Sequence, residues 1–249
     1  MKKIQILSML MHLIIIAFFS KAHTGEPNKP LTKQEYLLIH HLKQSLANAE
    51  QGVSALSQEV LSLEGMSSPK VRHLLNNLCS LPEVNYLEVG VWKGSTWIAS
   101  LYNNSSTVSS AVAIDNWSQF GAPRHQFIKS CNFFLKEMNY QFVDQDAFKI
   151  NLNLFLNPIN LYFYDGDHSI LSQEKAFTYF NPIFDNSFIA IVDDWNEPET
   201  QIGTYAAFDK LNYELLFEVI LPARWNGDID HWWNGVYAAV IRKTSKESQ

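Results

Sequence analysis

The feature that most constrains the fold is an alternation of strand-like and helix-like segments along the C-terminal two-thirds of the chain. Short apolar runs rich in β-branched and aromatic residues predict seven strands, at 84–89, 108–115, 140–143, 161–165, 188–193, 213–221 and 236–242. Helical spacing fills most of the gaps, at 94–102, 123–138, 172–180 and 200–210. This alternation predicts a mostly parallel α/β sheet with helices on both faces, and the last two strands, with no helix between them, predict an antiparallel finish.

Length and charge bound the rest of the molecule. The 249 residues allow one α/β domain, which we place at 67–249, behind an N-terminal extension that includes a linker and helix at 23–66. A net charge of -6 leaves no surface suited to phosphate backbones, so nucleic acid is excluded as a partner and a small neutral or cationic acceptor is favoured. Cys79 and Cys131 are too few for a disulfide framework, and two buried thiols are the simpler interpretation.

Residues 1–22 have the pattern of an export signal. Two lysines precede an apolar run at 4–20, and the small residues Ser20 and Ala22 follow it where a signal peptidase would cleave. The run is short for a bilayer span, so a permanent anchor is the second interpretation. We therefore expect a domain exported to the periplasm or outside if the signal is cleaved, and otherwise held at the membrane through residues 4–20 alone.

Between this segment and the first strand, the sequence predicts a helix over 32–65. Thr32 and Glu35 form a capping-box signature at its start. Apolar positions then recur in steps of three and four as far as Leu63, which is a heptad seam interrupted by Gly52. Two interpretations stay open: a homodimer through this helix, or packing against the chain's own domain. Ser68 and Pro69 predict the start of a second helix.

Polar residues follow the predicted strands, where an open α/β sheet binds its ligands. The first strand carries a glutamate and runs into a turn with two glycines, and the second ends in an acidic residue suited to the hydroxyls of a ribose: Glu88, Gly90, Gly94, Ser95 and Asp115. The spacing G-x-x-x-G departs from the dinucleotide fingerprint. A turn that merely needs two glycines would look the same.

At these residues the chain resembles the class I S-adenosylmethionine-dependent methyltransferases, which commonly carry E-x-G-x-x-x-G in the first strand and an acid at the end of the second. The resemblance covers 67–243 and implies a Rossmann-like seven-stranded fold. It also implies that Glu88, Gly90, Gly94 and Ser95 line the methionine end of S-adenosylmethionine and that Asp115 binds its ribose. The same likeness implies that the adenine of the cofactor lies against Trp117 and that its edge is bound at Asp146 and Ala147.

A second group of acids is more specific. D-G-D-H ends the fourth strand and D-D-W ends the fifth, so adjacent parallel strands would place four carboxylates and an imidazole at one edge. Such a concentration of like charge favours a compensating divalent cation that prefers oxygen ligands, although helix capping would account for one or two of the acids. The pair of motifs is similar to the metal-dependent small-molecule O-methyltransferases, including the macrocin and other sugar-directed enzymes. That likeness implies Mg²⁺ or another divalent cation on Asp165, Asp193 and Asp194.

Methyl transfer to a small hydroxylated acceptor, a sugar or a phenol, is therefore the predicted activity. A bound cation lowers the pKa of the acceptor hydroxyl, and Asp167 or His168 then accepts its proton, with Asp165 completing the predicted catalytic group. The aromatic segment at 225–233 either contacts the acceptor or packs its tryptophans under the sheet. The alternative from another class is an exported ligand- or carbohydrate-binding domain that keeps the same sheet without methyl transfer.

Overall fold

Seven strands form one sheet in the computed structural model, which describes residues 27–244. Their order across the sheet is β3-β2-β1-β4-β5-β7-β6. The strands are β1 (Val84–Val89), β2 (Val108–Asp115), β3 (Gln141–Asp144), β4 (Ile159–Tyr164), β5 (Phe184–Val192), β6 (Glu214–Leu221) and β7 (Val236–Arg242). The first five are parallel to one another, and β7 is antiparallel to both of its neighbours. The predicted mostly parallel sheet with an antiparallel C-terminal strand is confirmed.

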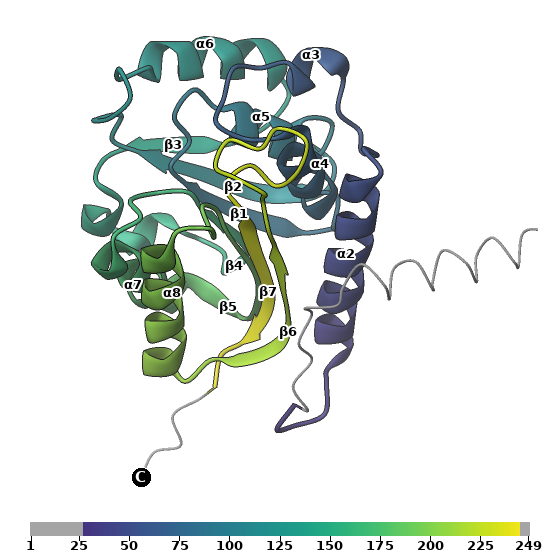
Figure 1. Ribbon diagram of the computed structural model, residues 1–249, viewed down its shortest axis with the longest axis vertical. Coiled ribbons are helices and arrows are strands. Elements are labelled where there is room, and N and C mark those ends of the chain that lie inside the picture. The colour runs from purple at the N-terminus through teal and green to yellow at the C-terminus, as the bar shows by residue number, and fades with distance from the viewer. Residues whose placement is uncertain (1–26, 245–249) are drawn as a thin grey trace, which may run out of the picture.

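Helices cover both faces of this sheet (Figure 1). One face carries the N-terminal helices together with two later ones, and the other carries the pair between β4 and β6. The first group is α2 (Lys33–Glu50), α3 (Gln58–Leu61), α4 (Pro69–Leu78), α5 (Ser95–Leu101) and α6 (Arg124–Phe134), and the second is α7 (Ile170–Thr178) and α8 (Pro198–Leu211). Short 3₁₀ turns occur at 147–149, 152–154 and 181–183.

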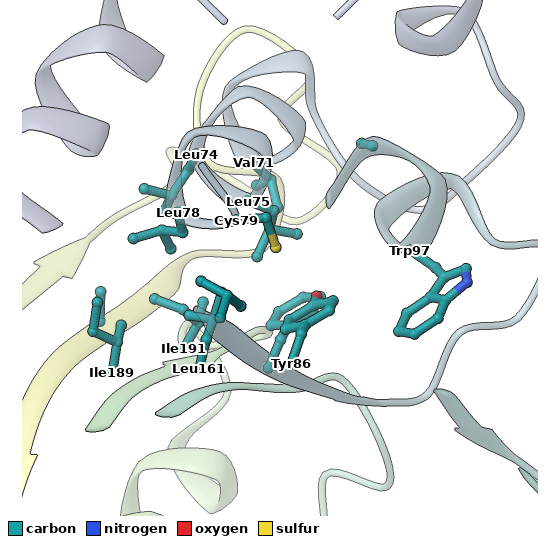
Figure 2. Packing of buried hydrophobic residues seen from close by; sticks show 14 of the residues in the cluster. Val71, Leu74, Leu75, Leu78, Cys79, Tyr86, Trp97, Leu161, Ile189 and Ile191 are labelled. Carbon is teal, nitrogen blue, oxygen red and sulfur yellow. The ribbon is translucent and has the colours of Figure 1, made fainter. Parts of the chain in front are cut away.

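Successive side chains of the central strands alternate between two apolar cores. Leu161 of β4 points to the core under α4, while the next residue, Tyr162, points to the core under α7 and α8. Figure 2 shows the first of these cores, where Leu75 and Leu78 of α4 lie over Tyr86 of β1 and the neighbouring strands. Burial on both faces explains why these strands are nearly continuous apolar runs in the sequence.

The N-terminal helix is shorter than predicted. The capping box at Thr32 and Glu35 is present, but α2 ends at Glu50, and Gly52 follows with φ +65°. Glycine tolerates this left-handed conformation, so it ends the helix that the apolar spacing alone would have continued to residue 65. The only later helical turn of the predicted segment is α3, and α2 packs on α4 and on β5, β6 and β7. The structure thus places the seam of α2 against the chain's own domain; a homodimer stays a prediction.

A charged cluster fixes the start of α2 to the sheet. The Arg242 guanidinium of β7 donates to both carboxylate oxygens of Glu35, each at 2.7 Å, and to Glu214 of β6 at 2.9 Å. Ser187 of β5 donates to Glu35 as well, at 2.8 Å. We call Glu35, Arg242, Glu214 and Ser187 the Arg242 cluster; it lies at the edge of the sheet where β5 begins.

The predicted export or anchoring segment at 1–22 lies outside the described residues. Within 27–244, no helix is long and apolar enough to cross a membrane. Cys79 and Cys131 are free and buried, as predicted. Export and cleavage after Ala22 stay predictions, which N-terminal sequencing of protein from its native host would test.

Candidate functional site

A cleft of about 570 Å³ opens at the carboxyl edge of the parallel strands. Residues just after β1, β2, β3, β4 and β5 line it, together with Met66 from the segment before α4 and Trp233 and Asn234 from the loop before β7. A cleft of this size suits a small molecule or a cofactor with its acceptor. This is the edge at which an open α/β sheet is expected to bind ligands.

The first predicted group of residues reaches this cleft only in part. Gly90, Asp115, Asp146 and Ala147 line it. Gly90 has φ +90°, and a Cβ at this position would meet the carbonyl oxygen of Asp165 at 1.9 Å, so any larger residue would displace the start of the β4 loop. Asp115 holds the surrounding turn: its carboxylate accepts from the backbone N–H groups of Trp92 at 2.8 Å and Trp117 at 2.6 Å.

Three of the predicted cofactor residues lie behind the cleft wall. Glu88 is fully buried and accepts hydrogen bonds at 2.6 Å from the hydroxyls of Tyr86 and Thr96. Burial raises the pKa of Glu88 to about 7. Gly94 has φ +87° and faces the ring of Phe127, and Ser95 is buried beneath Gly65. Glu88, Gly94 and Ser95 therefore pack behind the turn that carries Gly90 and do not form the surface of the cleft.

Trp117, the predicted adenine contact, is not among the residues that line the cleft. Its ring is buried against Phe127 and Phe142, and its Nε1 donates to the backbone oxygen of Trp92 at 2.8 Å. Trp92, Phe120 and Phe148 are the aromatic residues that line this side of the cleft. Phe148 follows Asp146 by two residues and Ala147 by one, so the sequence carried a local signal for it; Phe120 had none.

The second predicted group comes together at the cleft. Asp165, Asp167, His168, Asp193 and Asp194 all line it, because β4 and β5 are adjacent and parallel. His168 Nε2 lies 2.5 Å from Asp194 Oδ2. Ligand atoms of Asp165, His168 and Asp194 all lie within 4.8 Å of one another, which would allow them to share one ion. The three residues that the geometry brings together are therefore Asp165, His168 and Asp194, whereas the predicted ligands are Asp165, Asp193 and Asp194.

Asp193 is distinguished by what its side chain lacks. It is 2% exposed, and its Oδ1 has no hydrogen-bond partner among the described residues. An unpaired buried carboxylate oxygen is costly, so an absent ligand is the simplest explanation for it. Burial, together with Asp194, raises the pKa of Asp193 well above its ordinary value, and burial with Asp193 and Asp194 does the same for Asp165.

Asp167 has a local structural partner. Its Oδ1 accepts from the backbone N–H of Ser169 at 3.0 Å and from the Ser169 hydroxyl at 2.5 Å, just before α7 begins. These bonds, the hydroxyl first, lower the pKa of Asp167. A local turn onto Ser169, the N-cap of α7, therefore accounts for this acid, while its place at the rim keeps its negative charge next to the cleft.

The loop at 222–235 separates its tryptophans. Trp232 is buried, and its Nε1 donates to Glu50 at 3.0 Å, whereas Trp233 lines the cleft. Asn234 donates to Asp194 through Nδ2. One tryptophan of this segment thus packs inside and its neighbour faces the cleft, and contact with an acceptor stays a prediction. The link from Asn234 to Asp194 joins positions forty residues apart and left no signal in the sequence.

Several solved structures that are similar to this chain in fold are described as methyltransferases. TrmN from Thermus thermophilus matches with a TM-score of 0.53 at 11% identity, over 75% of this chain and 52% of TrmN, so the chain spans about half of that protein. A Staphylococcus aureus protein assigned as a caffeoyl-CoA O-methyltransferase gives 0.51 at 14%, over 84% and 98%. TomG from Streptomyces achromogenes, an O-methyltransferase of tomaymycin synthesis in complex with SAM, gives 0.50 at 14%, over 85% and 100%.

No family model matches the sequence. A search of curated proteins likewise finds no relative. At such low identities, the structural matches establish that the chain has the Rossmann-like fold of the class I methyltransferases, as predicted, and they leave its chemistry to be argued from the cleft.

Proposed function

We propose that this protein is an S-adenosylmethionine-dependent methyltransferase that methylates a hydroxyl oxygen of a small acceptor with the help of a divalent cation. One observation carries the proposal. The turn at Gly90, the ribose-binding candidate Asp115 and the acids after β4 and β5 all line a single cleft at the carboxyl edge of the sheet. The likeness in fold to O-methyltransferases supports the same conclusion, and nothing at the cleft favours a carbohydrate-binding domain without catalysis.

The cleft fits the cofactor along one side. Gly90 gives close access to the backbone, and Asp115 and Asp146 supply carboxylates for hydroxyl or amino groups. Phe120 and Phe148 offer flat apolar surfaces for an adenine. Glu88, Gly94 and Ser95 support these residues from behind, so we assign them a positioning role.

The cleft also fits a cation. Mg²⁺ prefers hard oxygen ligands, and such oxygens are present on Asp165, Asp193 and Asp194. The Oδ1 of Asp193 has no hydrogen-bond partner among the described residues, so its lone pairs are free to bind an ion. His168 is a further candidate, because its ligand atom lies within reach of those of Asp165 and Asp194. When bound, S-adenosylmethionine supplies the methyl group, and a divalent cation lowers the pKa of the acceptor hydroxyl.

His168 is the residue we assign as the proton acceptor. A carboxylate only accepts hydrogen bonds, so the contact of Nε2 with Asp194 places the proton of the neutral ring on Nε2. Nδ1 then keeps its lone pair, and Asp194 orients the ring, as a general base requires. Asp167 is the weaker candidate, because Ser169 already occupies one of its oxygens twice.

Calorimetry on the purified protein tests cofactor binding first. S-adenosylmethionine should bind, and Asp115→Asn should weaken that binding by about 1 to 3 kcal/mol through loss of charge-assisted hydrogen bonds. The two backbone amides that Asp115 holds bind different oxygens, so asparagine keeps only one of them, and circular dichroism must show that the variant is folded. The matched control is Asp209→Asn on exposed α8. No binding by the folded protein would refute the proposal.

Methyl transfer to hydroxylated sugars and phenols, with and without a chelator, tests the metal. Activity should need the cation, and Asp194→Asn should lose both Mg²⁺ binding and turnover. His168→Gln separates two roles: a proton acceptor loses turnover but keeps Mg²⁺ binding, whereas a ligand loses both. Full activity in excess chelator, with normal turnover in Asp194→Asn, would show that these acids serve only the fold.

A further inference from the structure

The charged side chains that line the cleft are nearly all of one sign. Six of them are aspartates: Asp115, Asp146, Asp165, Asp167, Asp193 and Asp194. Among the described residues that line the cleft, none is a lysine or an arginine, and His168 is the only basic group. The acids outnumber the positive charge that a divalent cation and a sulfonium cofactor would bring. The electrostatic potential of the loaded cleft therefore disfavours an anionic acceptor.

The lysines beside the cleft do not change this balance. Lys149 pairs with Asp146 at 3.1 Å, and the other five aspartates have no lysine or arginine partner among the described residues. Lys93 pairs with Glu64, and its Nζ lies 4.4 Å from the centre of the Trp92 ring. Trp92 lines the cleft but Lys93 does not. An acceptor carrying a carboxylate, a phosphate or a coenzyme A moiety would thus meet no lysine or arginine among the residues that line the cleft, although such side chains are the usual partners of these anions.

Trp233 supplies an aromatic wall beside the acids. It is a non-glycine residue with φ +57°, a left-handed conformation that is strained for residues other than glycine. Two backbone bonds with Asp228, at 3.0 and 3.1 Å, hold it there, and the buried carboxylate of Asp228 is bound in turn by Arg224. The next residue, Asn234, is bonded to Asp194. The loop therefore keeps a tryptophan ring next to the acids at the cost of backbone strain.

These observations identify the class of acceptor. We propose that the acceptor is a hydroxylated aromatic ring that carries a protonated amine. The ring lies against Trp233, and the ammonium is held in the field of the acids, with Asp167 at the rim as its nearest exposed carboxylate. Tryptophan attracts both an aromatic ring and a neighbouring cation. This inference rests on the proposed function, since it names the acceptor of that same cleft.

Three matched probes test the charge preference on the full chain. Dopamine, 4-ethylcatechol and 3,4-dihydroxyphenylacetate share a catechol and differ in a side chain that is cationic, neutral or anionic. Their binding is measured by calorimetry in the presence of Mg²⁺ and S-adenosylhomocysteine. We expect dopamine to bind at least about tenfold more tightly than the carboxylate, with 4-ethylcatechol between them. The difference should shrink in high salt, because screening weakens it.

Two variants with matched controls locate the preference. Asp167→Asn keeps an oxygen for Ser169 and should narrow the gap between dopamine and 4-ethylcatechol, whereas Asp209→Asn, with the same change in net charge on α8, should not. Trp233→Leu should weaken all three probes, and dopamine most. Its control is Trp225→Leu in the same loop, since Trp225 is exposed, stacks on Arg224 and does not line the cleft.

The outcomes separate this inference from the proposed function. Equal affinities, or tighter binding of the carboxylate, would overturn the inference. Binding of none of the three by protein that does bind S-adenosylhomocysteine would overturn it too, and would leave the methyltransferase standing with another acceptor. Failure to bind S-adenosylhomocysteine would refute the proposed function itself.

Discussion

Strand β5 begins beside one set of buried carboxylates and ends beside another, and the chain treats the two sets differently. At its start, Glu35 accepts from Arg242, Ser187 and Thr32, so every oxygen of that carboxylate is paired. At its end, Asp193 is as deeply buried, yet one of its oxygens has no partner among the described residues. The first set is paired with an arginine of the chain, and the second has no lysine or arginine partner among the described residues.

The difference indicates what each end of the sheet is for. A fold that needs a buried acid for its own stability supplies the positive charge itself, as the Arg242 cluster does. Acids left uncompensated in a cleft are typical of a site that binds a ligand or an ion. Five substitutions, in four predictions, would break or sharpen this comparison.

The largest expected effect follows from Arg242→Met. Removing the guanidinium leaves Glu35 and Glu214 without their cation, so the free energy of unfolding should fall by about 3 to 5 kcal/mol. Denaturant titration followed by circular dichroism measures it. A loss under about 1 kcal/mol, within the range of an exposed ion pair, would show that the Arg242 cluster is not what stabilises this end of the sheet.

Glu88 is a buried acid whose carboxylate accepts hydrogen bonds from two hydroxyl groups and has no cationic partner among the described residues. Its pKa of about 7 lies above the ordinary 4.5 because of burial, so stability from its neutral form is complete below pH 4.5 and is lost as the pH rises through 7. Glu88→Gln should remove that loss, which is on the order of 2 kcal/mol. Glu35, whose pKa is lowered to about 2 chiefly by Arg242, behaves oppositely and loses its stabilising effect as the pH falls from 4.5 towards 2. The measurement is the free energy of unfolding of both proteins as a function of pH. If the free energy of Glu88→Gln changed with pH above 4.5 in the same way as that of the parent protein, the prediction would be wrong.

The same change from an acid to its amide should raise the free energy of unfolding at one end of β5 and lower it at the other. Asp193→Asn relieves repulsion with Asp165 and Asp194, so without metal it should raise the free energy of unfolding by about 1 to 2 kcal/mol while abolishing methyl transfer. Glu35→Gln loses charge-assisted bonds and should lower it by a similar amount. Thermal melts with and without Mg²⁺ measure both. Destabilisation by Asp193→Asn in the absence of metal would mean that this acid is structural after all.

The smallest expected effect is that of an exposed pair. Arg124 and Asp144 lie 2.7 Å apart with nearly half of each side chain exposed. Arg124→Met should therefore cost no more than about 1 kcal/mol, and less in high salt. Denaturant titration at two salt concentrations checks this, and it also serves as the control for Arg242→Met. A cost as large as that of Arg242→Met would remove burial as the explanation of the difference between them.

Much of the fold was predictable from local patterns. Strands β1, β2 and β7 begin and end where the apolar runs predict, because strands buried on both faces must be apolar throughout. The meeting of D-G-D-H and D-D-W followed as well, since adjacent parallel strands end at the same edge. These features depend only on neighbours in sequence and on one rule of sheet topology.

Other features depended on contacts between distant segments. The spacing of apolar residues continued past Glu50, but the φ of Gly52 ended the helix. Trp117 and Trp232 are buried, while Phe120 and Trp233 line the cleft. All four are aromatic residues in loops, so their local sequence does not distinguish them. A tryptophan is equally suited to a core or a binding wall, and which one it serves depends on what lies opposite it.

The sequence by itself determined the order of the elements, the edge at which the cleft opens and the acids that gather there. Only the tertiary structure decided which buried acids have a hydrogen-bonding partner within the chain. Arg242 reaches Glu35 across 207 positions of the chain, and Asn234 reaches Asp194 across 40. Periodicity encodes which face of an element is buried, but pairing of charges is set by which side chains the finished sheet brings within hydrogen-bonding distance.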